Sequence, residues 1–187
     1  MKQTVYLQNH FLLAMPMMED PNLHHAVIYI CEHNQNGAVG IIVNRPTTVS
    51  LVDVLADMKI IAQDDIVRHI PVLFGGTVHQ ERGFVIHHPK GDWRSTLETG
   101  NEIFVTTSRD VLEAIAIHQG PPEVLVALGC CAWEPGQLEE ELKANTWLSV
   151  PANPRIIFET PFELRYIESM AALGVDLTNL SDEAGHA

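Results

Sequence analysis

The feature of this sequence that most limits its fold is a hairpin signal in the first quarter of the chain. Apolar runs rich in β-branched residues cover residues 26–31 and 38–43, and such residues favour strands. Between them stands Asn34-Gln35-Asn36-Gly37, and Asn and Gly accept the positive φ angles of a tight turn. The return run carries no polar side chain, so it lacks the alternation of a half-exposed strand. We therefore expect paired strands that are buried on both faces.

Further strand and helix signals follow along the chain. Apolar runs predict strands at 11–14, 72–74, 83–88, 103–107, 124–128 and 155–158, with 83–88 as the hairpin partner of 72–74. Helices are predicted after the caps Ser50 and Ser108, at about 136–144, and after Thr160 with Pro161 at the first helical position. Residues 129–133 are interpreted as a tight turn into the third helix. Hairpins precede helix–strand alternation, which favours a mixed sheet flanked by helices over a doubly wound fold.

Length and cysteine usage indicate one intracellular domain. The chain has 187 residues, of which 46% are hydrophobic, enough to bury on the order of 70% of its unfolded surface. No linker divides it, so residues 1–187 are predicted as a single domain. Cys31, Cys130 and Cys131 form a poor disulfide framework, and no secretory signal is recognisable, so we expect a cytoplasmic protein. No apolar run reaches about 18 residues, so no membrane span is expected.

Charge argues against direct contact with nucleic acid. The sequence has 11 Lys and Arg against 24 Asp and Glu, a net charge of −13. Neutralisation of phosphates by Lys and Arg supplies essentially all non-specific affinity for DNA, and the chain has no basic run. A direct transcription factor is therefore disfavoured. Any effect on transcription is expected to be indirect, through a protein partner or a metabolite.

The familiar local signatures of catalysis are missing. The sequence has no P-loop, no GxGxxG after a strand, no HExxH and no GxSxG. The neighbouring pairs His24-His25 and His87-His88 would point to opposite faces of a strand, so neither a metal site nor a cofactor is predicted. Cys130-Cys131 has no basic neighbour to stabilise a thiolate and is predicted to be structural. Trp133 and Trp147 bracket an acidic helix, which is interpreted as a solvated outer face. Catalytic residues stay unknown.

Four polar residues near the hairpin ends form the candidate ligand-binding set: Glu32, His33, Asn44 and Arg45. An Arg at the end of a buried strand presents five donors to a carboxylate or phosphate. The competing interpretation is an internal ion pair that anchors the loop, with Glu32 as partner. Sheet bending would bring the four side chains into one cleft, although in a tight hairpin Asn44 pairs nearer Ile28 than Glu32. We expect a small acidic ligand or a protein partner there.

Ordered motifs over nearly the whole chain match one bacterial family. They comprise residues 9–12 with 14–16 and 20–21, 31–33, 37–38 with Gly40, 44–46, 75–76, 82–84 with His88, Trp133 with 136–139, Asn145 with Trp147, and 185–187. On these residues the chain resembles the AlgH/YqgE-like family, whose activity is not established. The resemblance implies an α+β domain with a bent, bifurcated, barrel-like sheet, and a proposed role in regulating alginate synthesis. Thr77 and Cys130-Cys131 depart from the family pattern.

Two functions are open on this basis. The leading interpretation is a cytosolic binding or regulatory protein that uses a cleft near the hairpin ends. The alternative is a small hydrolase-like or transferase-like enzyme acting in the same cleft, near residues 31–46. Turnover of a substrate would favour the enzyme, and retention of a ligand without turnover would favour the binding protein.

Overall fold

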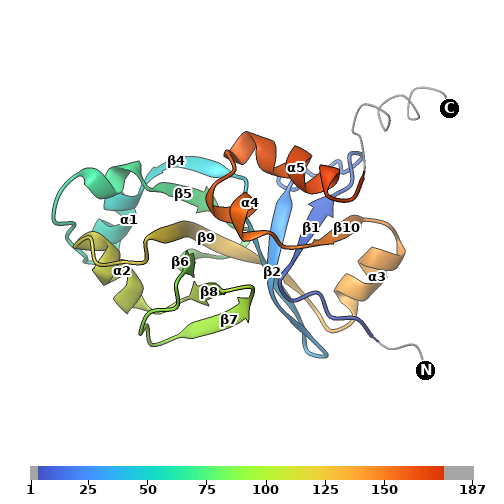
Figure 1. Cartoon of the computed structure of the whole chain (residues 1–187), viewed down its shortest axis with the longest axis horizontal. Helices are drawn as coiled ribbons and strands as arrows, with labels where there is room; N and C mark the ends of the chain where they lie inside the picture. Colours follow the sequence, from blue (N-terminus) through green and yellow to red (C-terminus); the bar gives the residue numbers. More distant parts are fainter. Residues whose placement is uncertain (1–3, 175–187) are drawn as a thin grey trace.

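The structure is a computed structural model that describes residues 4–174 (Figure 1). A curled sheet runs through the molecule in the spatial order β10-β1-β2-β3-β9-β6-β8-β7, and β4 pairs with β5 beside β9. The strands are β1 (His10–Ala14), β2 (Val27–Asn34), β3 (Gly37–Ile42), β4 (Pro46–Ser50), β5 (Pro71–Phe74), β6 (Val78–His88), β7 (Thr96–Gly100), β8 (Ile103–Thr106), β9 (Glu123–Trp133) and β10 (Trp147–Pro151). The helices are α1 (Leu51–Asp57), α2 (Arg109–Ala116), α3 (Gln137–Lys143), α4 (Pro154–Phe158) and α5 (Arg165–Ala171), with single 3₁₀ turns at Ile66–His69 and Phe162–Leu164.

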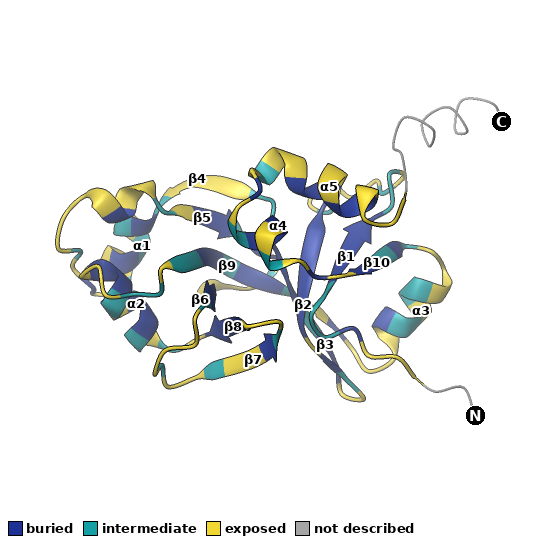
Figure 2. Cartoon of the chain, in the orientation of Figure 1, coloured by how far each residue is buried: buried dark blue, intermediate teal, exposed yellow. Residues whose placement is uncertain are grey.

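The predicted hairpin is confirmed and lies at the centre of one half of the sheet. β2 and β3 pair antiparallel from Ile28 opposite Ile42 to Asn34 opposite Gly37. One face of this half packs under α4 and α5, and the other packs against α3 (Figure 1). Both strands are therefore largely buried, as Figure 2 shows in dark blue. This double cover explains why the return strand carries no alternation.

The long strand β9 joins the two halves of the sheet. Its first part lies between β5, which is parallel to it, and β6, which is antiparallel. Its last residues pair with β3 instead. The change of partner occurs where Gly76 and Gly129 meet: a Cβ on Gly76 would overlap the carbonyl oxygen of Cys130, and one on Gly129 would overlap that of Gly76. The expected mixed, bent sheet in a single α+β domain is thus confirmed.

Two of the predicted strand and turn assignments around β9 are wrong. Residues 83–88 do not pair with 72–74, because β9 lies between β5 and β6. Residues 129–133 continue β9 as a strand and do not turn, because β3 provides their backbone partner. The turn into α3 comes at Glu134–Gly136, where Gly136 has a φ of +80°.

The chain after β10 also differs from the prediction. Residues 155–158 form α4 and not a strand. Asn153 caps this helix by accepting from the Arg155 N–H at 3.0 Å, and Pro154 occupies the first helical position. The last strand is β10. Thr160 does not cap the following turn, since its hydroxyl donates to Glu168 instead. The edge strands β4, β7 and β10 were not predicted from the sequence.

The other helices begin close to where the sequence predicts. Ser50 caps α1 by accepting from the Val52 N–H. Ser108 precedes α2 but does not cap it, because its hydroxyl donates to Asp110 and accepts from the Ser95 N–H, not from an N–H of the helix. Within residues 4–174, no helix is long and apolar enough to cross a membrane. The family-matching residues 185–187 lie outside the described part of the chain.

Candidate functional site

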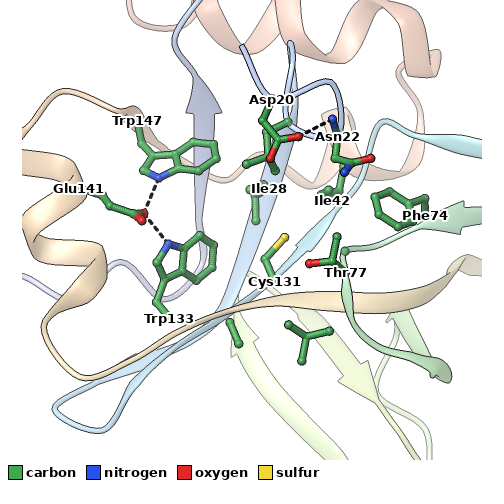
Figure 3. A pocket seen from close by; sticks show the side chains of 14 residues that line it. Asp20, Asn22, Ile28, Ile42, Phe74, Thr77, Cys131, Trp133, Glu141 and Trp147 are labelled. Carbon is green, nitrogen blue, oxygen red and sulfur yellow. Dashed lines mark hydrogen bonds between the residues drawn. The ribbon is translucent and has the colours of Figure 1, made fainter. Parts of the chain in front are cut away.

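A cavity of about 180 Å³ opens on the face of the sheet that α3 covers (Figure 3). Its walls come from β2, β3, the β5–β6 connection, β9, α3 and β10, together with the loop before β2. The lining residues are Asp20, Asn22, Leu23, Ile28, Ile42, Phe74, Gly76, Thr77, Val78, Cys131, Ala132, Trp133, Glu141 and Trp147. We call this space the indole cavity. It lies where β9 leaves β5 and pairs with β3.

Two indoles and one carboxylate form one wall of the indole cavity. The indole N–H of Trp133 donates to Oε2 of Glu141 at 2.7 Å, and that of Trp147 donates to the same oxygen at 2.9 Å. The rings lie nearly perpendicular, with centroids 6.3 Å apart. Gln137 donates to Oε1 of Glu141 at 3.3 Å. A carboxylate accepting three neutral donors fixes both rings in position without a cation (Figure 3).

Cys131 is the thiol that faces this cavity. Burial, with a smaller contribution from Cys130, raises the pKa of Cys131 to about 12. Its Sγ donates weakly to the Gly75 carbonyl oxygen at 3.8 Å. Burial likewise raises the pKa of Cys31 to about 12 and raises that of Cys130. A raised pKa disfavours the thiolate, which is the reactive form of a cysteine, at neutral pH.

His33, predicted as a ligand residue, braces the helix that carries Glu141. Its side chain is buried, and Nδ1 accepts from the Leu7 N–H at 2.9 Å. A backbone N–H on Nδ1 leaves the hydrogen on Nε2, which donates to Oε1 of Glu139 at 2.6 Å. This bond ties β2 to α3. His33 therefore supports one wall of the indole cavity from behind.

Asn44 and Arg45 brace the opposite wall. Asn44 accepts from the Val27 N–H at 2.9 Å and donates to the His25 carbonyl oxygen at 2.8 Å. The Arg45 guanidinium donates to the carbonyl oxygens of residues 21, 22 and 24. Residues 20–25, which we call the rim loop, carry the part of the cavity rim formed by Asp20, Asn22 and Leu23. The two side chains thus act on backbone groups and hold the rim loop in place.

Glu32 does not line the indole cavity. It accepts from the side chain of Asn34 at 3.3 Å and lines a separate depression of about 230 Å³ at the hairpin turn. The predicted ion pair between Glu32 and Arg45 is not formed: Glu32 is opposite Val39, near the turn, whereas Arg45 follows the open end of the hairpin. At 3.3 Å per residue, the six residues from Val39 to Arg45 span about 20 Å when extended.

The expected convergence of the four residues into one cleft is therefore wrong. The bulge between Ile30 and Glu32 does not fold one end of the hairpin onto the other. Contact of any of the four with a ligand stays a prediction.

Glu141, which belongs to the acidic helix predicted to be a solvated outer face, instead forms part of the cavity wall. A signal was present in the spacing. Leu138, Glu141 and Leu142 stand at i, i+3 and i+4, so Glu141 lies on the apolar face of α3 and not on its outer face. Within residues 4–174, no group of three or more His, Cys, Asp or Glu side chains is placed to hold a metal ion.

Fold and site together define a single α+β domain with a curled half-barrel sheet and a small aromatic cavity at its point of division. The chain belongs to the AlgH-like family (DUF179), whose model matches residues 11–178. It is 50% identical to a UPF0301 protein from Nitrosococcus oceani over the full length of both, and 49% identical to one from Nitrosospira multiformis, covering 99% of this chain and all of that protein. The family resemblance seen in the sequence is thus confirmed.

Solved structures agree with this assignment. The solution structure of the AlgH protein from Pseudomonas aeruginosa is 46% identical, covers 100% of both chains and has a TM-score of 0.82. A crystal structure from Corynebacterium diphtheriae, 17% identical with a TM-score of 0.67 over 89% of this chain and 86% of that one, shares the fold.

Proposed function

We propose that this protein is a cytosolic small-molecule-binding protein that uses the indole cavity and turns nothing over there. The observation that carries the proposal is the shared acceptor Glu141, which holds Trp133 and Trp147 in place before any ligand arrives. Side chains that are already ordered lose little conformational entropy on binding, which favours affinity. The braces through His33 and Arg45 add to this order from both sides of the cavity.

The chemistry of the cavity supports binding over catalysis. Thr77 and Cys131 are the hydroxyl and thiol on its walls. Within residues 4–174 neither makes a hydrogen bond to a basic side chain, and the high pKa of Cys131 keeps it protonated. An activated nucleophile needs an adjacent base or a depressed pKa. The hydrolase-like or transferase-like alternative therefore gains no support from this site.

A regulatory role, as expected from the family resemblance, would be indirect in our proposal. The net charge of −13 opposes binding to phosphate backbones. A ligand-dependent contact with a protein partner accounts for regulation without DNA binding. In a mobility-shift titration at physiological salt, we expect no saturable, salt-sensitive complex with duplex DNA below about 10 μM.

The indole N–H signals of the three tryptophans provide the test of binding. Trp133 and Trp147 report on the cavity, and Trp93, which packs against the core cluster of α1 and α2, is the internal reference. We expect compounds from a small-molecule library to shift the first two signals, to leave the third unchanged, and to be recovered chemically intact. The proposal fails when no compound produces this pattern, or when a bound compound is converted to product.

A further inference from the structure

The residues that line the indole cavity include two carboxylates and no cation; the Arg45 guanidinium lies behind the rim loop, on its backbone carbonyl groups. Glu141 and Asp20 line the cavity, and none of its lining residues is Lys, Arg or His. The ion pairs formed within residues 4–174 involve neither carboxylate. The indole and amide groups that donate to Glu141 are neutral, so they stabilise its charge without cancelling it. Because charges interact more strongly in a partly enclosed site than in water, this wall favours a positively charged ligand.

The aromatic side chains favour the same sign of charge. The indole rings of Trp133 and Trp147 lie at 81° to each other, and both line the cavity opposite Phe74 (Figure 3). A cation over an aromatic face is attracted by the ring quadrupole, most strongly by Trp. Ile28 and Ile42 form an apolar floor between these rings. The cavity thus combines aromatic and carboxylate groups around an apolar surface.

Size limits the ligand further. A volume of about 180 Å³ equals roughly six water molecules at ~30 Å³ each. Drug-sized ligands occupy cavities of roughly 300–1,000 Å³. The indole cavity therefore suits a compact molecule, or one small end of a larger molecule.

Building on the proposed binding function, we infer that the ligand of the indole cavity is a compact organic cation. It is an alkylammonium or arylalkylammonium ion whose charged group lies against Glu141 and the indoles, with its apolar body on Ile28 and Ile42. This reverses the small acidic ligand expected from the sequence. That expectation depended on Arg45, whose guanidinium donates to backbone carbonyl groups of the rim loop. A carboxylate or phosphate inside the cavity would meet two carboxylates.

Three probes of nearly equal shape test the sign of charge: benzylammonium, benzyl alcohol and benzoate. Titrations followed by the indole N–H signals of Trp133 and Trp147 give the affinities. We expect benzylammonium to bind about tenfold more tightly than benzyl alcohol, with benzoate weakest. We also expect the benzylammonium affinity to fall as salt is raised to about 0.5 M, because salt screens the attraction. Equal affinities, tighter binding of benzoate, or no shift with benzylammonium at about 10 mM would overturn the inference.

Two variants test whether Asp20 and Glu141 cause the preference for a cation. Asp20→Asn removes a charge but keeps the side-chain oxygen that accepts from the Asn22 N–H, so the rim loop keeps its turn. Glu141→Gln removes the second charge. Each is expected to lower the benzylammonium affinity severalfold and to change the benzyl alcohol affinity little. Asp53→Asn, on the exposed face of α1, removes the same charge far from the cavity and is the matched control. Unchanged ratios of the two affinities in both cavity variants would contradict the inference.

The proposed binding function and the inferred charge of the ligand can fail separately. When a neutral or anionic compound occupies the cavity in preference to benzylammonium, the binding function stands and the inferred charge is wrong. When neither the three probes nor the library shifts the two indole signals, the binding function itself is wrong. A disturbed Glu141→Gln variant is recognised by its own indole signals before any ligand is added, and Asp20→Asn then decides the question alone.

Discussion

Nε2 of His33 lies 2.6 Å from Oε1 of Glu139, and this bond joins the central hairpin to the helix that carries Glu141. His33 is buried, whereas Glu139 is partly exposed at the edge of the contact. A residue identified in the sequence as a direct ligand contact thus acts one step behind the cavity. Asn44 and Arg45 have the equivalent place behind the rim loop. The polar residues of the hairpin position the cavity walls from both ends.

Removing the carboxylate of Glu139 should loosen α3. Glu139→Ala leaves the His33 Nε2–H buried without its partner, which costs about 1–3 kcal/mol of unfolding free energy. Glu139→Gln keeps an acceptor oxygen and should cost less. Urea unfolding measures both. The control is Glu140→Ala, whose exposed ion pair with Lys143 is worth less than about 1 kcal/mol. A Glu139→Ala protein as stable as the control would show that the bond does not brace the helix.

Removing the guanidinium of Arg45 should free the rim loop. In Arg45→Ala the carbonyl groups of residues 21, 22 and 24 lose their shared donor. Hydrogen exchange should accelerate at the amide of Leu23, which closes a turn inside this loop, and at that of Ala26, which closes the turn at its end. Arg155→Ala, which removes an exposed helix-surface pair with Glu159, is the control. Equal protection of the loop amides in both variants would contradict this role.

The elements with strong local signals could be predicted from sequence, and those decided by distant partners could not. Asn34 to Gly37 marks the β2–β3 turn, and Ser50 marks the start of α1, within a few residues of chain. The fate of residues 129–133 depends on β3, about 90 residues away in the sequence, so their own composition suggested a turn.

The same difference between local signals and distant partners applies to the residues of the candidate site. The polar side chains of Glu32, His33, Asn44 and Arg45 indicated a functional role. The strand register that places Glu32 and Arg45 about 20 Å apart along the hairpin, however, appears only when the hairpin is built. Glu141 could have been recognised from its helical spacing to Leu138. Its contact with two indoles could not, because Trp133 and Trp147 approach it from two different strands.

The crossing of the β5–β6 connection with β9 should tolerate no side chain. Gly76 has a φ of +154°, and a Cβ there would overlap the carbonyl group of Cys130. Gly76→Ala should therefore lower the unfolding free energy by about 3 kcal/mol or more, since backbone would have to move. Gly136→Ala is the matched control: its φ is +80°, but no atom lies within 4 Å of the added carbon. Its cost is about 1–2 kcal/mol of strain. Similar losses in the two variants would exclude a backbone contact at Gly76.

Stability should fall in mild acid because of His87. This side chain is fully buried between the Pro89 carbonyl oxygen and the Thr106 hydroxyl. Burial, which outweighs the bond to Pro89, lowers its pKa below the ordinary value of 6.5. Above that value both states are neutral; below it the unfolded chain binds a proton that the native state excludes. The unfolding free energy therefore decreases as pH falls below 6.5, by at most about 1.4 kcal/mol per pH unit for this one group.

His87→Gln should reduce this slope between about pH 6.5 and 5, measured by urea unfolding at each pH. The control is His69→Gln, at an exposed position in the 3₁₀ turn, which should keep the wild-type slope. A slope unchanged in His87→Gln would assign the acid sensitivity to other groups.

Cys131 should be slow to react although it lines the cavity. Its thiol is only partly buried, so an alkylating reagent can reach it. The pKa of about 12 limits the reaction, because only the thiolate attacks. At pH 7.5 the thiolate fraction is on the order of 10⁻⁵, against roughly a tenth for a free cysteine. Iodoacetamide labelling of the native protein should therefore be about a thousandfold or more slower than labelling in urea, where all three cysteines react.

A benzylammonium-sized ligand would slow the labelling of Cys131 further by occupying the cavity. Rapid, selective modification of Cys131 at neutral pH would reveal a stabilised thiolate, and it would return the enzymatic alternative to consideration.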